Sequence, residues 1–542
     1  MKEEIKKFFK GDVAFDPETL KKYSRDASLF EIKPKLVLFP KDAADVKNLV
    51  KWANENKKKY PDLSITPRSA GTDMTGGPLG HSIILDFTKY MNRLSYFEGS
   101  KITVEPGMYY RDFEKIASKK GMMLPSYPAS KSICAIGGMV ANNAGGEKTL
   151  AYGKTDDFIE ELKIVLADGN EYTIKALSKE ELDKKMAQNN FEGNLYRSVF
   201  DIIDTNKNLL AEAKPKVSKN SSGYYLWNVW NEKIFDLNRL LAGSQGTLGI
   251  ITEVTFRLVK MRPNSRLTVV FLKDLAPLAP LINELRKLQP ESIEIYDDKT
   301  LRFAMRYFFD FLKNRSFFSA LKFAWGFWPD LFILLRGGLP KLVLLVEFAD
   351  GFEAVEKKSK AAATIADRLR LLHRLTKSKA DTEKYWEIRR ESFNLLRKHS
   401  GGKRTAPFID DIIVKPEDMP AFLPALENIL KKYPIEYSIA GHAGDGNFHV
   451  IPLMDLSDPK SAQIILELAE RVYDLVISFG GSISAEHNDG IIRTPYLSKM
   501  FGKEMIIIFQ KIKDIFDPKN LFNPGKKVGG KKEAIQKYLR KN

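Results

Sequence analysis

The chain has 542 residues, more than one hydrophobic core usually serves, so two or more domains are expected. Apolar residues make up 44% of it, which excludes wholesale disorder, and the single cysteine, Cys134, excludes an intramolecular disulfide framework. The net charge of +17 calls for an anionic partner or surface. Nucleic acid is not expected as that partner, since there is no arginine-rich helix, zinc-finger spacing or RNP-type segment.

The first residues contain no apolar stretch of secretory length, so we expect a cytoplasmic protein. Residues 1–34 are polar and predict an N-terminal helical extension. A strand at 35–40 and a helix from Asp42 to Trp52 then begin an α/β unit, because Val46, Leu49 and Val50 share one stripe.

A strand at 64–68 runs into a loop at 69–77 that is dense in Gly, Ser and Thr. Such a loop exposes consecutive backbone N–H groups, as a pyrophosphate site requires. It is neither G-x-G-x-x-G nor a Walker loop, and taken alone it also describes a flexible surface loop.

Two further clusters of small residues follow, at 130–146 and at 219–224 with 243–254. Expected strands at 82–86 and 101–107 and a helix at 111–120 come before the first of these clusters, and a hairpin at 159–174 lies between the two. Ser178 and Glu181 are spaced as a helix capping box. Clusters repeated on successive α/β units indicate a large ligand that needs close backbone approach.

Histidines concentrate near a predicted hairpin, with strands at 436–443 and 448–453 around the turn at 444–447. If Ala443 and Phe448 close the loop, His442 lies directly opposite His449, with Cβ atoms roughly 4.5–5.5 Å apart. With Glu486 this gives the ligands of a catalytic metal site that keeps one position open, leaving His487 as a proton acceptor. Two histidines that only hydrogen-bond locally are the alternative.

The segments Pro67-Arg68-Ser69-Ala70-Gly71-Thr72, Ile136-Gly137-Gly138, Asn142-Asn143-Ala144-Gly145-Gly146, Tyr152-Gly153 and Gly246-Thr247-Leu248-Gly249-Ile250-Ile251-Thr252 resemble the FAD-binding domain of the vanillyl-alcohol oxidase type. The run from His442 to His449, then Glu486-His487 and Phe522-Asn523-Pro524-Gly525-Lys526, resembles the D-2-hydroxyacid dehydrogenase branch. The resemblance covers roughly residues 35–527.

This resemblance implies an α+β fold: a two-part FAD-binding domain of the p-cresol methylhydroxylase (PCMH) type over 35–260, an α+β substrate (cap) domain over 261–510, and a segment 511–542 that returns to the FAD domain. It implies non-covalent FAD, because Ser69 and Ala70 stand where covalently linked relatives carry a histidine. The cofactor-binding residues expected from it are Arg68, Ser69, Ala70, Gly71, Thr72, Asp73, Thr75, Gly76, Gly137, Gly138, Asn142, Asn143, Ala144, Gly145, Tyr152, Gly153, Gly249, Ile250, Ile251 and Asn523.

The family's metal ligands correspond to His442, His449 and Glu486, for a divalent metal that we expect to be zinc, and its base corresponds to His487. Arg389 matches the arginine that grips the substrate carboxylate, and Asn447 is expected to orient the acid. For a second basic contact only Lys403 and Arg404 are candidates.

The implied reaction oxidises a D-2-hydroxy acid of the D-lactate, glycolate or D-2-hydroxyglutarate class to the 2-oxo acid, with hydride transfer to flavin N5. Electrons would leave to a quinone, an electron-transfer flavoprotein, an iron–sulfur subunit or oxygen, because one cysteine cannot ligate a cluster. Two alternatives stay open: an alkylglycerone-phosphate synthase-like flavoenzyme, and an inactive flavin-bearing membrane scaffold.

Residues 301–345 interrupt the expected substrate domain with interleaved aromatic and basic residues. No run there is long and uncharged enough to span a bilayer. The pattern is typical of an interfacial membrane segment, so we predict peripheral attachment to the cytoplasmic membrane face. A docking surface for a protein partner and plain domain core are the other interpretations.

Overall fold

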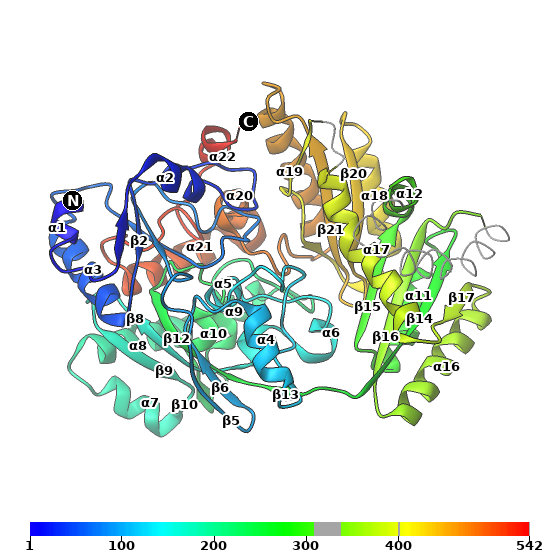
Figure 1. Cartoon of the computed structure of the whole chain (residues 1–542), viewed down its shortest axis with the longest axis horizontal. Coiled ribbons are helices and arrows are strands. Elements are labelled where there is room, and N and C mark those ends of the chain that lie inside the picture. The colour runs from blue at the N-terminus through cyan, green and yellow to red at the C-terminus, as the bar shows by residue number, and fades with distance from the viewer. Residues whose placement is uncertain (308–337, 399–401, 541–542) are drawn as a thin grey trace.

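The computed structural model describes residues 1–307, 338–398 and 402–540, and Figure 1 shows two halves side by side. The left half contains the N-terminal residues (blue to teal) and the C-terminal helices (red). The right half is formed by residues coloured green to orange and is built around one large sheet. The α+β fold expected from the sequence is confirmed.

The first sheet of the left half has the order β1-β2-β4-β3. Its strands β2 (Leu36–Phe39), β4 (Ile83–Asp86) and β3 (Ile65–Arg68) are parallel, and helix α3 (Ala43–Asn56) connects β2 to β3. Asp42 caps α3 by accepting from the N–H of Asp45 at 3.1 Å, and the predicted stripe of Val46, Leu49 and Val50 is buried. The strand–helix unit predicted at 35–52 is therefore confirmed.

Residues 1–34 contain more than the predicted helices. Besides α1 (Lys2–Ile5) and α2 (Pro17–Tyr23) they include the strand β1 (Asp12–Ala14), which pairs antiparallel with β2. A three-residue edge strand carries too short an alternation of apolar and polar residues for sequence periodicity to reveal it.

The second sheet of the left half is antiparallel, with the order β5-β6-β12-β8-β9. The hairpin predicted at 159–174 is the pair of β8 and β9. The strands are β5 (Leu94–Glu98), β6 (Lys101–Val104), β12 (Ile250–Arg257), β8 (Ile159–Val165) and β9 (Glu171–Lys175).

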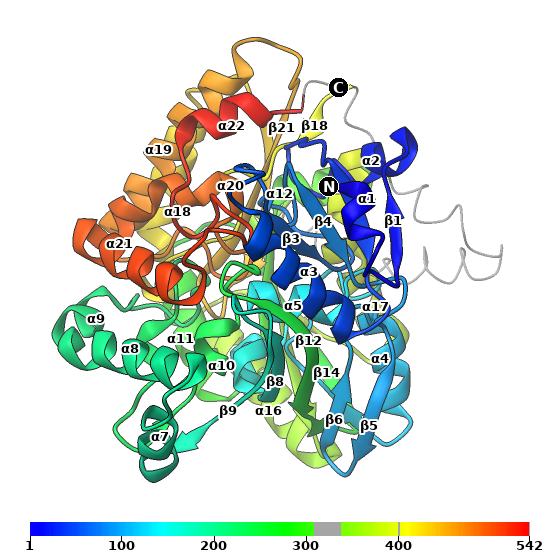
Figure 2. The same cartoon turned by 90° about the vertical axis from the view of Figure 1, so that its left-hand side faces the viewer.

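Helices cover these sheets, and in Figure 2 α8, α9 and α21 stack on one side of the left half. The capping box of Ser178 and Glu181 is present at the start of α7. The helices are α4 (Tyr110–Ser118), α5 (Ile136–Asn142), α6 (Thr149–Tyr152), α7 (Lys179–Met186), α8 (Phe191–Thr205), α9 (Lys207–Ala213), α10 (Asn238–Leu241), α20 (Gly490–Arg493), α21 (Leu497–Phe516) and α22 (Lys532–Tyr538).

Shorter elements join these parts. They are the paired strands β7 (Met122–Met123) and β13 (Val259–Lys260), the pair β10 (Leu177–Ser178) and β11 (Ile234–Phe235), and the 3-10 turns η1 (Thr155–Asp157), η2 (Leu226–Asn228), η3 (Pro416–Asp418) and η4 (Thr494–Tyr496).

The C-terminal segment returns to the first sheet, as expected. Phe522 forms a parallel bridge with Ile65, whose N–H donates to the carbonyl of Leu521 at 2.7 Å. The N–H of Asn523 in turn donates to the carbonyl of Ile65 at 3.0 Å.

The large sheet of the right half has the order β17-β14-β16-β15-β20-β21-β18, and β19 also pairs with β21. Its strands are β14 (Asn264–Leu272), β15 (Ser292–Asp297), β16 (Leu342–Asp350), β17 (Leu372–Leu375), β18 (Arg404–Thr405), β19 (Ile412–Ile413), β20 (Glu436–His442) and β21 (Asn447–Met454).

Each face of this sheet has its own helices. Buried residues of α11 (Leu278–Lys287), α16 (Phe352–Arg368), α18 (Met419–Leu430) and α19 (Ser461–Ser478) pack on the face of Ile293 and Ile295. Residues of α12 (Asp298–Arg306) and α17 (Lys379–Lys398) pack on the face of Tyr296 and Leu345. The second face also carries Glu294, because side chains two positions apart in a strand point the same way.

The predicted hairpin of β20 and β21 exists, but the predicted register is wrong. His442 pairs with Asn447, and His449 pairs with Ala440. The left-handed φ of +79° that the turn requires is taken by Gly446, so the loop is residues 443–446 and closes one residue earlier on each strand. His442 and His449 remain on one face, because the pairing moves by an even number of residues.

Most of the aromatic and basic segment at 301–345 lies outside the described residues, which resume at 338. At its described beginning, Leu301 and Ala304 of α12 are buried against α17, while Phe303 and Tyr307 are partly buried beside them. This beginning is therefore domain core. No helix in the described part of the chain combines the length and the apolar character that a membrane span requires.

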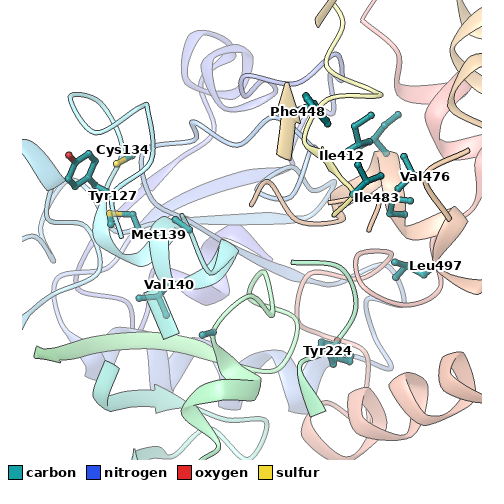
Figure 3. Close-up of a cluster of buried hydrophobic side chains, with 14 of the residues drawn as sticks. Tyr127, Cys134, Met139, Val140, Tyr224, Ile412, Phe448, Val476, Ile483 and Leu497 are labelled. Carbon is teal, nitrogen blue, oxygen red and sulfur yellow. The ribbon is translucent and has the colours of Figure 1, made fainter. Parts of the chain in front are cut away.

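One core cluster includes residues of both halves. Figure 3 shows Met139 and Val140 of α5 in the left half, and Ile412, Phe448, Val476 and Ile483 gathered in the right half. Cys134 belongs to this cluster beside Tyr127 and is buried, and burial raises the pKa of its thiol to about 12.

Candidate functional site

A cavity in the left half is walled by small residues from three separate segments, and we call it the small-residue cavity. The first is the loop after β3, the second includes α5, and the third leads into β12. Its lining residues are Pro67, Arg68, Ser69, Ala70, Gly71, Thr72, Asp73, Gly77, Pro78, Phe87, Pro106, Ala135, Gly137, Gly138, Ala141, Asn142, Gln245, Gly246, Gly249 and Ile251. The three clusters picked out in the sequence therefore share one wall.

Two glycines show how closely this wall is built. A Cβ on Gly137 would lie 2.7 Å from Pro106 Cβ and 2.8 Å from Ser69 Oγ. Gly71 takes a left-handed φ of +68° that L side chains rarely adopt. The backbone of the three segments therefore packs closely in this wall, which suits a dinucleotide whose pyrophosphate is bound by backbone amides.

Of the predicted cofactor-binding residues, Arg68, Ser69, Ala70, Gly71, Thr72, Asp73, Gly137, Gly138, Asn142, Gly249 and Ile251 line this cavity. Others hold the wall from behind. The N–H and hydroxyl of Thr75 donate to Asp73 Oδ2, and Gly76 packs against Phe30 and Ile491. Ile250 points into the core of the first sheet.

Asn523 ties two wall segments together. Its amide nitrogen donates to the carbonyl of Gly77 at 2.9 Å and to that of Gln245 at 2.7 Å. Arg68 lines the cavity, but its guanidinium donates to the carbonyl of Arg25 at 2.8 Å and lies over the ring of Tyr23. Both side chains act here as braces of the wall.

The remaining predicted residues lie along the boundary between the halves. Asn143 ends α5 with a φ of +49°, and the Ala144 carbonyl accepts from the N–H of Thr155 at 3.0 Å. Tyr152 lies 5.1 Å below the guanidinium of Arg262, and Gly153 lines a separate crevice that also contains Asp445. The structure thus brings neither Tyr152 nor Gly153 to the small-residue cavity.

The histidine cluster lies next to this cavity, and two contacts join them. Asn142, in the cavity wall, accepts through its carbonyl from the amide of Asn488 at 3.3 Å. A Cβ on Gly145 would lie 3.2 Å from Glu486 Oε1, so the loop passes close to this carboxylate. Asn488 and Glu486 flank His487, so all three are adjacent to the cavity wall.

His442, His449 and Glu486, the predicted metal ligands, converge. The rings of His442 and His449 stand perpendicular with centroids 5.2 Å apart. His442 Nε2 lies 3.4 Å from Glu486 Oε2. The local hydrogen-bonding alternative does not account for a carboxylate brought in from residue 486.

His487 lies parallel to His449, with ring centroids 5.1 Å apart. Asp410 lies beside both imidazoles: its Oδ1 is hydrogen-bonded to His449 Nδ1 at 3.0 Å, and its Oδ2 makes an ion-pair contact with His487 Nδ1 at 3.0 Å. Asp411, with a φ of +64°, accepts from the backbone N–H groups of Glu486 (2.8 Å) and His487 (2.7 Å). The two aspartates therefore fix the ring planes and the backbone of the cluster.

Asn447 is fully buried behind the cluster. Its amide nitrogen donates to Asp411 Oδ1 at 3.2 Å and to the carbonyl of Ile412 at 3.1 Å. This places Asn447 as a support of Asp411.

Lys219 occupies the far side of Glu486. Its ammonium lies 2.7 Å from Glu486 Oε1 and 3.0 Å from Asp445 Oδ2, and its side chain is fully buried. Glu486 therefore presents one oxygen to Lys219 and the other to His442.

Glu294 links the cluster to Arg389. Its Oε1 lies 2.6 Å from His442 Nδ1, and its Oε2 lies 3.2 Å from an Arg389 terminal nitrogen. The predicted carboxylate-gripping arginine is thus one buried carboxylate away from the imidazoles.

Neither candidate for the second basic contact faces the cluster. Lys403 pairs with Glu436 at 2.5 Å. Arg404 pairs in register with Met454 of β21, whereas His449 lies on the face of the odd-numbered residues of that strand. Arg404 therefore emerges on the opposite face of the sheet from His449.

The charges of the cluster perturb one another strongly. Burial alone would lower the pKa of His442, but the carboxylates of Glu294 and Glu486 outweigh it and raise this pKa to about 9. Burial is likewise outweighed at His487, where Asp411 and Asp410 raise the pKa to about 9. Burial would raise the pKa of Glu486, but Lys219 and His442 hold it well below its usual range.

This donor set fits a divalent cation, since imidazole and carboxylate groups are its usual ligands. One ligand atom each from Asp411, His449, Glu486 and His487 lie within 4.8 Å of one another. His442 reaches the same carboxylate of Glu486 from the other side. The geometry thus admits two assignments, in which either His442 or His487 completes the ligand set.

Several residues of the site escaped the sequence reasoning: Lys219, Glu294, Asp410, Asp411 and Gln245. Three of them carried a usable pattern. Asp410 and Asp411 directly precede the apolar run Ile412-Ile413-Val414, and Glu294 is a charged residue inside the otherwise apolar strand β15. A buried charge needs a partner, so such positions point to a site.

Two known families match the chain. Residues 34–175 match the FAD binding domain family, and residues 262–527 match the family of FAD linked oxidases, C-terminal domain. The first match contains the loop 68–77 and α5, and the second contains all members of the histidine cluster except Lys219.

Curated relatives have related descriptions. The chain is 28% identical to "D-2-hydroxyglutarate dehydrogenase" of Escherichia coli over 96% of this chain and 50% of the relative. It therefore spans about half the length of that protein. It is 27% identical to "Glycolate oxidase subunit GlcD" of Bacillus subtilis (93% and 91% covered) and 26% identical to "D-lactate dehydrogenase" of Archaeoglobus fulgidus (91% and 91%).

Solved structures establish the fold. p-Cresol methylhydroxylase with substrate bound gives a TM-score of 0.66 at 16% identity (96% of this chain, 94% of that one). Alkyldihydroxyacetonephosphate synthase gives 0.66 at 15% identity (96% and 84%). Together with the family matches, these findings show that the chain belongs to the FAD linked oxidases, with an FAD binding domain followed by the C-terminal domain of that family, in the fold of p-cresol methylhydroxylase.

Proposed function

We propose that this protein oxidises a D-2-hydroxy acid to the 2-oxo acid with non-covalently bound FAD and a divalent cation. The observation that carries the proposal is the closeness of the small-residue cavity to the histidine cluster: Asn142 of the cavity wall bonds with Asn488, and Gly145, on the loop that follows Asn142, lies beside Glu486. The names of the relatives from E. coli, B. subtilis and A. fulgidus support the substrate class.

Two groups absent from the structure supply part of the chemistry. When bound, FAD takes up a hydride and a divalent cation lowers the pKa of an alcohol that it contacts. The small-residue cavity would hold the FAD, and Glu486 and His449, with His442 or His487, would hold the cation.

In this proposal the proton of the substrate hydroxyl goes to the neutral form of His487; a divalent cation beside the ring would favour that form against Asp411 and Asp410, which raise the pKa to about 9. His487 Nδ1 faces Asp410 at 3.0 Å, so Nε2 is the atom that takes the proton, and the Asp410 carboxylate stabilises the imidazolium that results. Arg389 binds the substrate carboxylate, sharing or giving up its contact of 3.2 Å with Glu294.

Anaerobic reduction tests the reaction. Purified protein loaded with FAD is mixed with D-lactate, glycolate, D-2-hydroxyglutarate or D-glycerate, and the visible absorbance of the oxidised flavin is followed. We expect at least one acid to bleach it. If none does, including after addition of Zn²⁺ or Mn²⁺, the proposed oxidation is wrong.

The two ligand assignments are separated by metal content. His442→Ala and His487→Ala are each measured by mass spectrometry for bound metal and by absorbance for bound FAD. If His442 is a ligand and His487 is the base, only the first variant loses metal, and both keep FAD. Metal loss in His487→Ala alone would reverse the assignment.

The electron acceptor in this proposal is a quinone, an electron-transfer flavoprotein or an iron–sulfur subunit. The proposed surface of attachment is the cytoplasmic membrane face. Attachment through the segment 301–345 is tested by co-sedimentation with anionic and neutral liposomes. A deletion of residues 306–336 should lose binding to anionic liposomes, and equal binding by both proteins would exclude the membrane role.

A further inference from the structure

Helix α17 contacts both halves of the molecule through two consecutive arginines. Arg389 reaches Glu294 of β15, within its own half, at 3.2 Å. Arg390 reaches Glu147 of the left half, with one terminal nitrogen 2.6 and 2.8 Å from the two carboxylate oxygens. Because consecutive helical residues point about 100° apart, one turn of α17 can engage both halves.

Glu147 lies on the loop that leads from the small-residue cavity to the histidine cluster. Asn142 at the start of this loop lines the cavity, and Gly145 packs against Glu486. The hydroxyl of Tyr127 donates to Glu147 at 3.0 Å, so the carboxylate that Arg390 contacts is itself held in place. The ion pair therefore joins α17 to the part of the left half that is nearest the reaction centre.

The neighbouring residue makes a second contact across the same boundary. Lys148 lies 2.5 Å from Glu291, whose other oxygen lies 2.8 Å from Arg262. Glu291 is almost completely buried and comes three residues before Glu294. Glu147 and Lys148, consecutive residues of one loop, thus hold two elements of the right half. One is α17, which carries Arg389, and the other is β15, which carries Glu294.

We propose that Glu147 and Arg390 form an inter-domain clamp that positions Arg389 over the reaction centre. Arg390 is then a positioning residue: it contacts neither the predicted ligands nor the cavity, and it fixes the helix whose preceding residue binds the substrate carboxylate. The role of Arg389 in this statement rests on the proposed function, but the clamp itself does not.

Charge reversal tests the clamp. The variants Arg390→Glu and Glu147→Arg are compared with the double variant Glu147→Arg/Arg390→Glu, which restores opposite charges in the reverse order. Arg368→Glu is the matched control, because Arg368 pairs with Glu284 at 2.8 Å within the right half alone. FAD content by absorbance and metal content by mass spectrometry are expected to be equal in all variants.

The kinetic readout is the division between KM and kcat. We expect each single reversal to raise KM for the hydroxy acid by about fivefold, as losing a partly exposed ion pair would, with a smaller change in kcat. The double variant should recover most of this loss, and Arg368→Glu should match the wild type. Unchanged KM in Arg390→Glu, or a double variant no better than the single ones, would overturn the proposal.

Hydrogen exchange gives a readout that is independent of activity. Amides of residues 379–390 should exchange faster in Arg390→Glu than in wild type and should slow again in the double variant. Equal exchange in these three proteins would refute the clamp. If no acid reduces the wild-type flavin, the proposed function fails, while this exchange comparison still decides whether the clamp exists.

Discussion

The small-residue cavity is walled by closely packed backbone, whereas the histidine cluster beside it is made of charged side chains. Gly137 leaves no space for one more carbon atom, since a Cβ there would lie 2.7 Å from Pro106. In the histidine cluster, in contrast, the Lys219 side chain fills the space between Asp445 and Glu486 and pairs with both. Adding atoms to its wall should therefore impair the cavity, whereas removing charged side chains should impair the cluster.

Removal of His487 should have the largest effect. His487→Ala is expected to lower kcat by about 10²–10⁴-fold with FAD still bound, because it removes the proposed proton acceptor but no part of the cavity wall. Steady-state rates with an artificial dye as acceptor measure this. His373→Ala, on the edge strand β17, is the control and should keep the wild-type rate; a similar loss in that variant would remove the basis for assigning the base.

Removal of Lys219 should destabilise the fold itself. Lys219→Met leaves Asp445 and Glu486 buried without their shared cation, and breaking a buried ion pair on one side costs about 3–5 kcal/mol of unfolding free energy. Denaturant unfolding in metal-free buffer measures it. Lys207→Met, which removes a surface pair with Asp204, should change stability by less than about 1 kcal/mol. Equal losses in the two variants would contradict the buried network.

Addition of one carbon should weaken the cavity. Gly137→Ala is expected to weaken FAD binding, because the added Cβ must displace Pro106 or Ser69 in the cavity wall, and overpacking of this kind usually costs about 1–3 kcal/mol of folding free energy. Titration of FAD into the apoprotein gives the dissociation constant. Gly351→Ala is the matched control, because a Cβ there meets nothing within 4 Å. Unaltered FAD affinity in Gly137→Ala would place the dinucleotide elsewhere.

The smallest expected effect concerns pH. Burial raises the pKa of Glu347 to about 7, with Glu147 and Glu291 adding to this and Lys148 opposing it. Between the ordinary pKa of 4.5 and about 7 the folded protein keeps this proton while the unfolded chain loses it. Unfolding free energy should therefore fall as pH rises through this window, and no further above it.

Glu347→Gln should flatten that fall by about 1–2 kcal/mol, measured as denaturant midpoints from pH 5 to 8. Glu180→Gln, on the exposed side of α7, should leave the slope as it is. A slope that is the same in the Glu347→Gln variant would show that Glu347 is ionised in the folded state.

The same contrast decides what could be predicted from the sequence. The cavity wall is made of runs of small residues that are contiguous in the chain, such as 68–77 and 137–145, so periodicity and composition reveal them. Of the cluster, the sequence indicates His442, His449, Glu486 and His487, whereas residues 219, 294, 410 and 411 join them only in the folded protein. Asp410, Asp411 and Glu294 stand out as charges beside or inside apolar runs, but no spacing in the sequence indicates which partners they meet.

The hairpin shows the limit most clearly. Turn composition placed the two strands correctly, but it could not decide whether Gly446 or Asn447 takes the left-handed φ, and the register depends on that choice. Arg404 is a related case: in the sequence it is a cation before a strand, and only its pairing with Met454 shows that it lies on the other face from His449.

The bridge between Ile65 and Phe522 affects how the protein is made. Residues separated by more than four hundred positions complete one sheet, and Asn523 then fastens the pocket from behind. During synthesis on the ribosome, this edge of the sheet stays uncovered until almost the whole chain has been made. Binding of the nucleotide is therefore expected after residue 523 has been synthesised and not before.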